Sequence, residues 1–399
     1  MVQSTAQPTT QRSEDAQYWD VSASLDVTYK VICANGVLLS SNPLLLQLGS
    51  SEKNWRGDRG GRRIVFVENE VFRFYSGAIN RFFCGEGSQI VVLNATEKSK
   101  NLQLVERTVE QMVQFGVNRR SEPVIAIGGG CLMDAVGFAA SIYRRHVPYV
   151  RVPTTLLGIV DAGIGIKTGV NFGLHKNRIG SYCAPVATVL DTTFLATLPN
   201  RHIRNGLAEV LKMAIVSDAT LFQLLESHAS DLVEACAKSS PVSLKIIKRS
   251  IQRMLDALEP NLWEHDLYRT VDFGHTFSPV IEMLKVDCLL HGEAVAIDMC
   301  ISTIIAARRH LIDIAAADRI IALTKRMGLP VINSDCTAAN MQTALDDVVK
   351  HRDGLQRIPV PTAIGEATFL NDVCLQEVME ACEYLQRPFD EGVLGLSSF

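Results

Sequence analysis

The sequence predicts a chain of two domains: an α/β domain built on a doubly wound parallel sheet, followed by an all-α domain. Three observations predict this arrangement. In the first half, short apolar runs rich in β-branched residues alternate with helical patterns, as in βαβ units. A run of three glycines separates one such strand from the helix that follows it. Beyond about Leu198 long helical patterns dominate, so we place the domain boundary near Pro199.

The α/β domain is expected at 26–198, after a tail at 1–25 that is rich in Gln, Ser and Thr and is expected to be mobile. Apolar runs without polar alternation are typical of buried parallel strands, and they occur at 64–67, 89–93, 124–127 and 149–152. Helices are predicted at 104–115 and 131–143. In the first of these helices, the residues expected to share the buried side are Val105, Val109, Met112 and Val113.

The all-α domain is expected at 199–399. Apolar residues at helical spacing predict its helices at 204–216, 220–236, 242–258, 292–310 and 315–327. The most apolar late stretch, 289–307, carries His291, Glu293 and Asp298. A membrane-spanning helix does not tolerate three ionisable groups without a special role, so we expect no membrane span.

The composition argues against several other classes of protein. The chain has 399 residues, 47% hydrophobic and 21% charged, with a net charge of −4. These values are typical of a globular protein and argue against a nucleic-acid partner. Ten cysteines are scattered without a CxxC pair, so we expect reduced thiols in a cytoplasmic protein. The N-terminus lacks the pattern of a signal peptide.

The glycine run Gly128–Gly130 is a candidate phosphate-binding turn. It follows a strand and opens a helix, where backbone N–H groups can face an anion. The spacing is not the usual GxGxxG, and a tight turn without a ligand explains it equally well. Asp134 lies in the first turn of that helix, where it either contacts a ligand or stabilises the helix N-terminus.

Polar side chains follow in a stretch punctuated by glycines. Asp161, Lys167, Asn171, Lys176 and Asn177 offer the charges and amides that suit a phosphorylated, polyhydroxylated ligand. From spacing alone, a solvated surface loop is an equally good interpretation.

Three further residues form a candidate metal site. Glu209 lies three residues before Lys212 on one face of a predicted helix, and His275 and His291 follow later in the chain. One Glu and two His residues are a recurring metal set that leaves positions open for substrate oxygens. Taken singly, the Glu–Lys pair also fits an exposed ion pair and each histidine a structural residue.

Together these motifs resemble the sugar-phosphate cyclases of the dehydroquinate-synthase type, over about 122–365. The motifs that carry the resemblance are Gly128-Gly-Gly-Cys-Leu-Met-Asp134, Pro153-Thr-Thr-Leu-Leu, Lys167-Thr-Gly-Val-Asn171, Lys176-Asn177, Ala208-Glu-Val-Leu-Lys212, Gly274-His-Thr-Phe277 and His291-Gly-Glu-Ala-Val295. The resemblance implies a Rossmann-like NAD-binding domain, an α-helical domain that binds metal and substrate, and a homodimer.

The resemblance also implies two cofactors, NAD+ and one divalent metal ion, Zn2+ or Co2+. The implied metal ligands are Glu209, His275 and His291. The implied NAD contacts are Glu68, Lys98, Gly129, Gly130, Asp134, Thr154 and Thr155. The implied substrate contacts are Asp161, Lys167, Asn177 and Lys212, with Arg145 reaching the phosphate across the dimer interface. Of these residues Lys212, Asp161, Lys167 and His275 are the expected catalytic set.

In this family one substrate hydroxyl is oxidised transiently by NAD+, phosphate is eliminated, the hydride is returned and an intramolecular aldol step closes the ring. The metal polarises an oxygen and the retained cofactor carries the hydride. The implied enzyme is therefore a phosphate-eliminating lyase with no net redox change.

Several substrate positions depart from those of dehydroquinate synthases. Met254 stands where they have Lys, Tyr268 where they have Arg, Asp272 where they have Asn and Pro279 where they have His. A pocket that has lost two cations and gained an anion disfavours a carboxylate substrate, since one charge pair at about 4 Å is worth roughly 4 kcal/mol at an effective dielectric of 20. Arg269 would point about 100° away on a helix, and it restores the charge only if the register is off by one.

The departures favour a neutral-headed ketose phosphate, sedoheptulose 7-phosphate. The string Arg269–Pro279 resembles the 2-epi-5-epi-valiolone synthases, and His351 fits them too. The 2-epi-valiolone and desmethyl-4-deoxygadusol synthases remain alternatives. Dehydroquinate synthase, 2-deoxy-scyllo-inosose synthase and metal-dependent polyol dehydrogenases fit less well. The phosphate-binding Lys of dehydroquinate synthases has no clear match, and His351 or Arg352 is the expected substitute.

Overall fold

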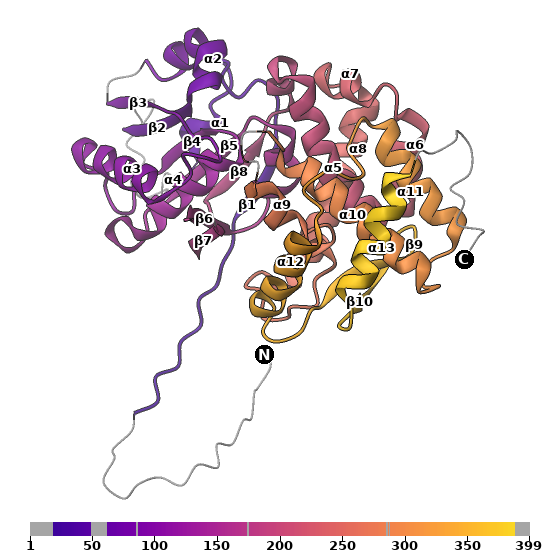
Figure 1. Cartoon of the computed structure of the whole chain (residues 1–399). Coiled ribbons are helices and arrows are strands. Elements are labelled where there is room, and N and C mark those ends of the chain that lie inside the picture. The colour runs from indigo at the N-terminus through magenta and orange to yellow at the C-terminus, as the bar shows by residue number, and fades with distance from the viewer. Residues whose placement is uncertain are drawn as a thin grey trace, which may run out of the picture.

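The computed structural model describes residues 19–48, 62–84, 87–173, 175–284, 286 and 288–387. The predicted tail at 1–25 falls mainly outside the described residues. The N-terminal part is an α/β unit and the C-terminal part is mostly helical, which confirms the predicted fold class (Figure 1). The boundary near Pro199 stays a prediction.

A six-stranded parallel sheet forms the centre of the N-terminal part, in the order β1-β8-β5-β4-β2-β3. Its strands are β1 (Lys30–Cys33), β2 (Arg63–Glu68), β3 (Ser88–Leu93), β4 (Val124–Gly128), β5 (Tyr149–Pro153) and β8 (Ala187–Leu190). Both faces of the sheet are covered: Phe66 packs with the core under α3 and α4, and its neighbour Val65 with the core under α1 and α2. This two-sided burial explains why the inner strands β2, β4, β5 and β8 are mostly apolar, whereas the edge strands β1 and β3 are partly exposed.

The helices of this part are α1 (Leu44–Gln47), α2 (Asn69–Phe82), α3 (Leu102–Phe115) and α4 (Gly130–Ile142). The predicted inner side of α3 was partly wrong, because Val113 is 58% exposed whereas Leu104 and Thr108 are buried. Asn101 caps α3 by accepting the N–H groups of Gln103 and Leu104.

The polar stretch between β5 and β8 is not a loop. It forms a π-helical turn, η2 (Gly158–Ala162), and an antiparallel hairpin of β6 (Lys167–Phe172) and β7 (His175–Tyr182) that packs on α4. Its alternating and glycine-rich composition gave no continuous apolar run, so the sequence did not predict the strands.

The C-terminal part packs around one large core. Its helices are α5 (Asn200–Ser217), α6 (Ala219–His228), α7 (Leu232–Ala237), α8 (Pro241–Leu258), α9 (Ser278–Leu284), α10 (His291–Arg308), α11 (Ile314–Arg326), α12 (Ala338–His351) and α13 (Leu375–Gln386). A hairpin of β9 (Ile358–Ala363) and β10 (Glu366–Leu370) completes it. The single helix predicted at 220–236 was wrong: it breaks at a turn around Ser230 and Asp231, residue types that favour turns.

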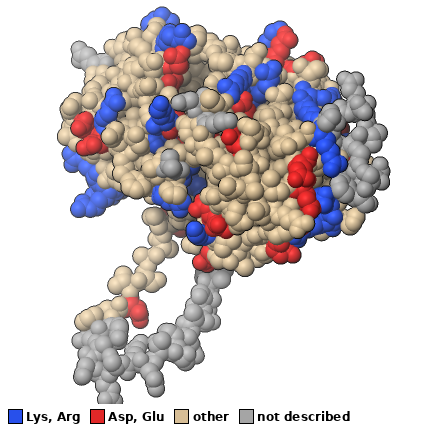
Figure 2. All heavy atoms as spheres, in the orientation of Figure 1, with Lys and Arg blue, Asp and Glu red and all other residues tan. Residues whose placement is uncertain are grey.

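Helix α10 passes through this core and is buried almost along its whole length. No helix among the described residues combines the length and the apolar character that a membrane crossing needs. On the face shown in Figure 2, basic and acidic side chains are interspersed, in keeping with the net charge of −4. All ten cysteines are free thiols, as expected; the cytoplasmic location stays a prediction.

Candidate active site

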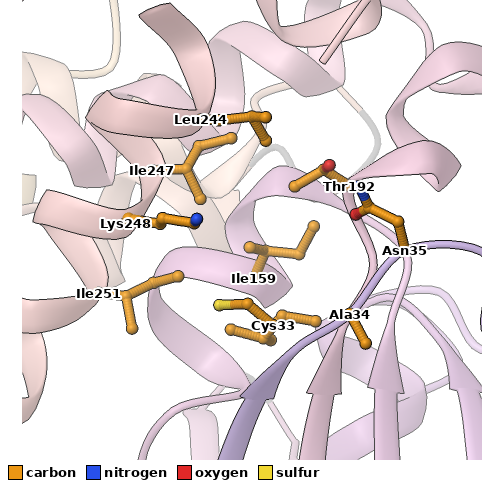
Figure 3. A pocket seen from close by; sticks show the side chains of 10 residues that line it. Cys33, Ala34, Asn35, Ile159, Thr192, Leu244, Ile247, Lys248 and Ile251 are labelled. Carbon is orange, nitrogen blue, oxygen red and sulfur yellow. The ribbon is translucent and has the colours of Figure 1, made fainter. Parts of the chain in front are cut away.

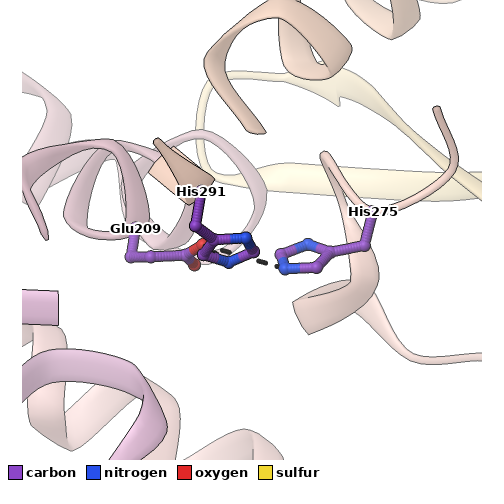
Figure 4. Close-up of side chains that lie close together, drawn as sticks. All are labelled: Glu209, His275 and His291. Carbon is purple, nitrogen blue, oxygen red and sulfur yellow. Dashed lines mark ion pairs between the residues drawn. The ribbon is translucent and has the colours of Figure 1, made fainter. Parts of the chain in front are cut away.

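Glu209, His275 and His291 converge, although they lie far apart in the sequence (Figure 4). Glu209 is on α5, His275 follows a short 3-10 turn, η5 (Thr270–Asp272), and His291 is the first residue of α10. Their nearest ligand atoms all lie within 4.8 Å of one another. The Nε2 atoms of His291 and His275 are 3.3 and 3.8 Å from Glu209 Oε1. This is the donor set of a divalent metal site with open positions.

Hydrogen bonds from the far side of each imidazole orient the two histidines. His275 Nδ1 lies 3.1 Å from the carbonyl of Phe273, and His291 Nδ1 lies 2.9 Å from Glu282 Oε2. If Nδ1 carries the proton in both rings, as these acceptors favour, Nε2 is free to bind a metal ion. Lys176, buried against both oxygens of Glu282 at 2.6 and 2.7 Å, neutralises that carboxylate.

The electrostatics of the three residues also fit a cation. Glu209 is fully buried, and neither of its oxygens accepts a hydrogen bond with good geometry, although Lys212 Nζ lies 2.5 Å from Oε2. Such a carboxylate needs a nearby positive charge. Burial lowers the pKa of His275 to about 3, so this imidazole is neutral. Burial also opposes the charge on His291, but Glu282 and Glu209 raise its pKa to about 9, so without a metal this imidazole carries a proton that metal binding would displace.

Lys212 and Asp161 lie next to this metal-binding triad. Lys212 is 2% exposed and its Nζ is 3.5 Å from Asp161 Oδ1, on η2. Although burial disfavours its charge, Glu209 and Asp161 raise the pKa of Lys212. Burial raises the pKa of Asp161. The structure thus brings together five residues from distant motifs, with an ammonium group that can hold or deliver a proton beside the candidate metal ligands.

Two glycines allow the helices to approach closely enough to form the triad. A Cβ on Gly206 of α5 would lie 2.5 Å from the backbone nitrogen of Leu157, and one on Gly292 of α10 would lie 2.0 Å from the carbonyl oxygen of Asn205. Asn205 Oδ1 in turn accepts the N–H of Gly292 at 2.5 Å. This contact ties the start of α10, and with it His291, to the helix that carries Glu209.

A second site lies at the carboxyl ends of β2 and β4, where parallel sheets commonly bind dinucleotides. The N-terminus of α4 has no side-chain cap, so its first N–H groups are available to an anion. A Cβ on Gly128 would lie 2.7 Å from Leu132 Cδ2, and one on Gly129 would lie 3.3 Å from Thr155 Cγ2. These residues therefore fit a phosphate cradle in which the backbone is left open.

The other residues expected to bind NAD lie around this cradle. Glu68 ends β2 and caps α2 by accepting the N–H of Val71, and burial raises the pKa of this carboxyl group. Thr154 donates its N–H to the carbonyl of Gly128, and Thr155 accepts the N–H of Gly158. A Cβ on Gly130 would lie 3.4 Å from Ala162.

The sequence did not single out Lys100. Its Nζ is 2.5 Å from Asp134 Oδ2 and 2.6 Å from Asn177 Oδ1, and the side chain is 3% exposed. Burial disfavours the charge of Lys100, but Asp134 and Glu97 raise its pKa. The expected contact Lys98, two residues away, lies exposed. The sequence shows two lysines after β3, Lys98 and Lys100, and only their burial in the structure tells which one points inward.

The region around Asp272 corrects an expectation about Arg269. Arg269 is in extended backbone before η5, not on a helix, so its side chain reaches Asp272, with Nη1 3.0 Å from Oδ1. Arg269 also pairs with Glu264, which contacts Lys167 and accepts a hydrogen bond from Tyr182 at 3.2 Å. The expectation that Arg269 lies on a helix and points away from this position was therefore wrong.

Comparison with known proteins decides the family. The family model of the 3-dehydroquinate synthase N-terminal region matches residues 90–205, and that of the C-terminal region matches residues 206–350. A 2-epi-5-epi-valiolone synthase of Actinomyces is 45% identical over 93% of this chain and 98% of its own length. A 3-dehydroquinate synthase of Prochlorococcus marinus is 33% identical over 88% of this chain and 98% of its own. The chain belongs to the dehydroquinate-synthase-like cyclase family.

A solved structure of this cyclase family is similar over nearly the whole chain. The 2-epi-5-epi-valiolone synthase of Streptomyces hygroscopicus, solved with NAD+ and Zn2+ bound, has a TM-score of 0.86 and 45% identity over 92% of this chain and 99% of that chain. A 2-deoxy-scyllo-inosose synthase shares the fold at 22% identity with a TM-score of 0.73.

The positions at which this cyclase departs from dehydroquinate synthases have different surroundings. Met254 is 2% exposed within the helical core. Tyr268 is 44% exposed, with its ring edge-on to Phe369 at 5.2 Å. Pro279 is the second residue of α9, a position where proline is well tolerated.

Three expected substrate or phosphate contacts remain, and two of them, His351 and Arg145, are exposed. His351 ends α12 at the surface, and its pKa is lowered by partial burial and by nearby Lys167. Arg352 is 2% exposed and its Nη1 donates to the backbone carbonyls of Gln356 and Arg357, whereas its Nε has no hydrogen-bond partner among the described residues. Its role in place of the phosphate-binding Lys stays a prediction. Arg145 is exposed in the turn after α4.

The cavity drawn in Figure 3 lies apart from the site just described. It has a volume of about 160 Å³ and lies between the ends of β1 and β8 and helix α8. Its walls are mostly apolar, with Ile159 of η2 on one side, and Lys248 and Cys33 are among its lining residues. None of the predicted site residues lines it.

Proposed function

We propose that this protein converts sedoheptulose 7-phosphate to 2-epi-5-epi-valiolone and releases phosphate, as a carbon–oxygen lyase. One observation carries the proposal: the triad of Glu209, His275 and His291 lies beside Lys212, on a fold whose α4 N-terminus is open to a nucleotide phosphate. The 45% identity to 2-epi-5-epi-valiolone synthases over most of the chain supports the product.

We further propose that the triad holds one divalent metal ion, Zn2+ or Co2+, and that the glycine cradle holds NAD+. When bound, the metal supplies Lewis acidity and the nucleotide supplies a reversible hydride acceptor. The residues of the chain do the rest. Lys212, charged and buried, holds a proton at the reacting oxygen, and Asp161 orients it.

Asp272 and Lys167 are the proposed contacts to the rest of the substrate. Asp272 lies three residues before the metal-binding His275, whose N–H donates to the Asp272 carbonyl at 3.0 Å. Its carboxylate can accept hydrogen bonds from the hydroxyls of a ketose. Lys167 is 56% exposed on β6, and among the described residues its ion-pair partner is Glu264, so a phosphate can recruit it.

The decisive experiment is incubation of the purified protein with sedoheptulose 7-phosphate, NAD+ and Zn2+. We expect one phosphate released per substrate, a C7 cyclitol identified by NMR as 2-epi-5-epi-valiolone, and no accumulation of NADH at 340 nm. Steady NADH formation with phosphate retained would instead identify a polyol dehydrogenase.

The homodimer is also a proposal. In it, Arg145 of one subunit would reach the substrate phosphate bound by the other. The exposed position of Arg145 after α4 is compatible with such a role.

A further inference from the structure

Glu264 occupies an unusual position in the chain. It lies in the segment between α8 and η5, and its backbone has a positive φ of 56°, which is uncommon for a residue other than glycine. Its side chain is nevertheless only 12% exposed. A carboxylate that is nearly buried on a connecting segment needs partners of opposite charge, and the structure supplies them from other elements.

Two cations share the Glu264 carboxylate. Arg269 Nη1 lies 2.5 Å from Glu264 Oε1, and Lys167 of β6 contacts the same oxygen. Tyr182 of β7 donates to the other oxygen at 3.2 Å. Glu264 therefore connects both strands of the β6–β7 hairpin to the segment that leads into η5.

The same network reaches the metal-binding triad. Arg269 Nη1 is also 3.0 Å from Asp272 Oδ1, and the Asp272 carbonyl accepts the N–H of His275. The positive charges of Lys167 and Arg269 are thus matched by the negative charges of Glu264 and Asp272. The two pairs differ in strength: Arg269 is 10% exposed and well shielded, whereas Lys167 is 56% exposed and its pairing is screened by water.

We propose that Glu264 determines substrate specificity by occupying Arg269, so that this nearly buried cation is not free to bind a carboxylate at the head of the substrate. Arg269 is the cation that could otherwise replace the lost Lys and Arg of dehydroquinate synthases. With Glu264 in place, the site admits a seven-carbon ketose phosphate that ends in a neutral CH2OH and rejects the heptulosonate that ends in a carboxylate. The inference rests on the proposed function, because it presumes a ketose phosphate in this site.

The test is a binding experiment with two ligands that cannot lose phosphate, the 7-phosphonates of the CH2OH-headed seven-carbon 2-ketose and of the corresponding carboxylate-headed 2-keto acid. Their dissociation constants are measured by calorimetry on the protein loaded with NAD+ and Zn2+. For Glu264→Gln, which keeps the size of the side chain and removes its charge, we expect the carboxylate ligand to bind about tenfold more tightly relative to the neutral one. A purely structural role for Glu264 would weaken both ligands together.

Two variants make the result decisive. Glu264→Asp keeps the charge on a shorter side chain and should give a smaller gain of about two- to threefold, which also tests the idea if Glu264→Gln does not fold. Glu259→Gln removes an exposed carboxylate from the same connecting segment and should leave the affinity ratio unchanged. An unchanged ratio in both Glu264 variants overturns the inference. Failure of the wild type to release phosphate from sedoheptulose 7-phosphate overturns the proposed function instead.

Discussion

Asp298 of α10 is fully buried, and its Oδ2 accepts the backbone N–H groups of Thr276, Phe277 and Ser278 at 2.7, 2.5 and 2.9 Å. These three residues directly follow His275. Asp298 therefore fixes the backbone that presents His275, one of the three proposed metal ligands, although it is not one of them itself. Residues that orient ligands in this way commonly change metal affinity about 10- to 100-fold when they are substituted.

For Asp298→Asn we expect Zn2+ to bind about tenfold or more weakly, because an amide replaces one charged acceptor of three N–H groups. The affinity is measured by competition with a chromogenic chelator. Glu209→Ala should abolish both stoichiometric Zn2+ and turnover, and Asp313→Asn, on an exposed helix cap, should change neither. Wild-type Zn2+ affinity in Asp298→Asn would show that the His275 segment holds its shape alone.

At the same scale, the sequence predicted the metal triad because Glu209, His275 and His291 have distinctive neighbours. It did not predict which of two nearby side chains turns inward. Lys98 and Lys100 differ by two positions, and the orientation of Arg269 depends on an extended backbone that its composition does not reveal. Tertiary packing determines these side-chain orientations, and the periodicity of the sequence does not reveal it.

Elements with an uninterrupted apolar pattern were predictable, and short or mixed ones were not. The strands β2 to β5 and the long helices α5, α8 and α10 were found close to their true bounds. The hairpin β6–β7 and the turn η2 were missed because polar residues interrupt any apolar run in these segments. The close approach of helices α5 and α10 depends on a glycine, which has no Cβ.

The crossing of α5 and α10 should not tolerate a methyl group at Gly292. In Gly292→Ala the Cβ would meet the carbonyl of Asn205 at 2.0 Å, so α10 must shift away and carry His291 from Glu209. We expect loss of bound Zn2+ and a drop of about 2–3 kcal/mol in unfolding free energy. Gly77→Ala, in the middle of α2 with only an arginine tip at 3.4 Å, should be neutral or slightly stabilising.

Helix α13 provides a test of pH dependence. Glu377 caps its N-terminus and pairs with Arg309 of the α10 end, and that pairing lowers the pKa of Glu377 to about 2. A lowered pKa in the folded state stabilises it above the unfolded pKa of about 4.3, and this stability is lost as the pH falls towards 2. Because the pair is partly exposed, we expect Glu377→Gln to cost about 1–2 kcal/mol at pH 7 and less at pH 4, measured by urea unfolding. A cost that is independent of pH would contradict this.

The whole molecule divides its chemistry between two halves. The glycine cradle and Asp161 belong to the α/β part, whereas the metal ligands and Lys212 belong to the helical part. Close contacts such as that between Gly206 and Leu157 pack the two halves together. The change of pattern near Pro199 predicted this division but not the contact, and the partner subunit was implied by the family resemblance alone.

The proposed dimer predicts complementation between two inactive proteins. Arg145→Ala and Lys212→Ala should each turn over little substrate. After mixing and subunit exchange, a mixed dimer carries one site in which both residues are intact. We therefore expect activity to return to a substantial fraction of the wild-type value, with the assembly checked by light scattering. No recovery in a confirmed mixed dimer would place Arg145 outside the partner's site.

The convergence of Glu209, His275 and His291 has a consequence for folding. A metal ion bound there would act as a cross-link between segments that are widely separated along the chain, and closing such long loops restricts the unfolded ensemble. The free energy of metal binding would then be shared with the folding of the helical half. Chelation should accordingly expose this half to proteolysis and hydrogen exchange before it affects the parallel sheet, so that metal supply would set the lifetime of the protein as well as its turnover.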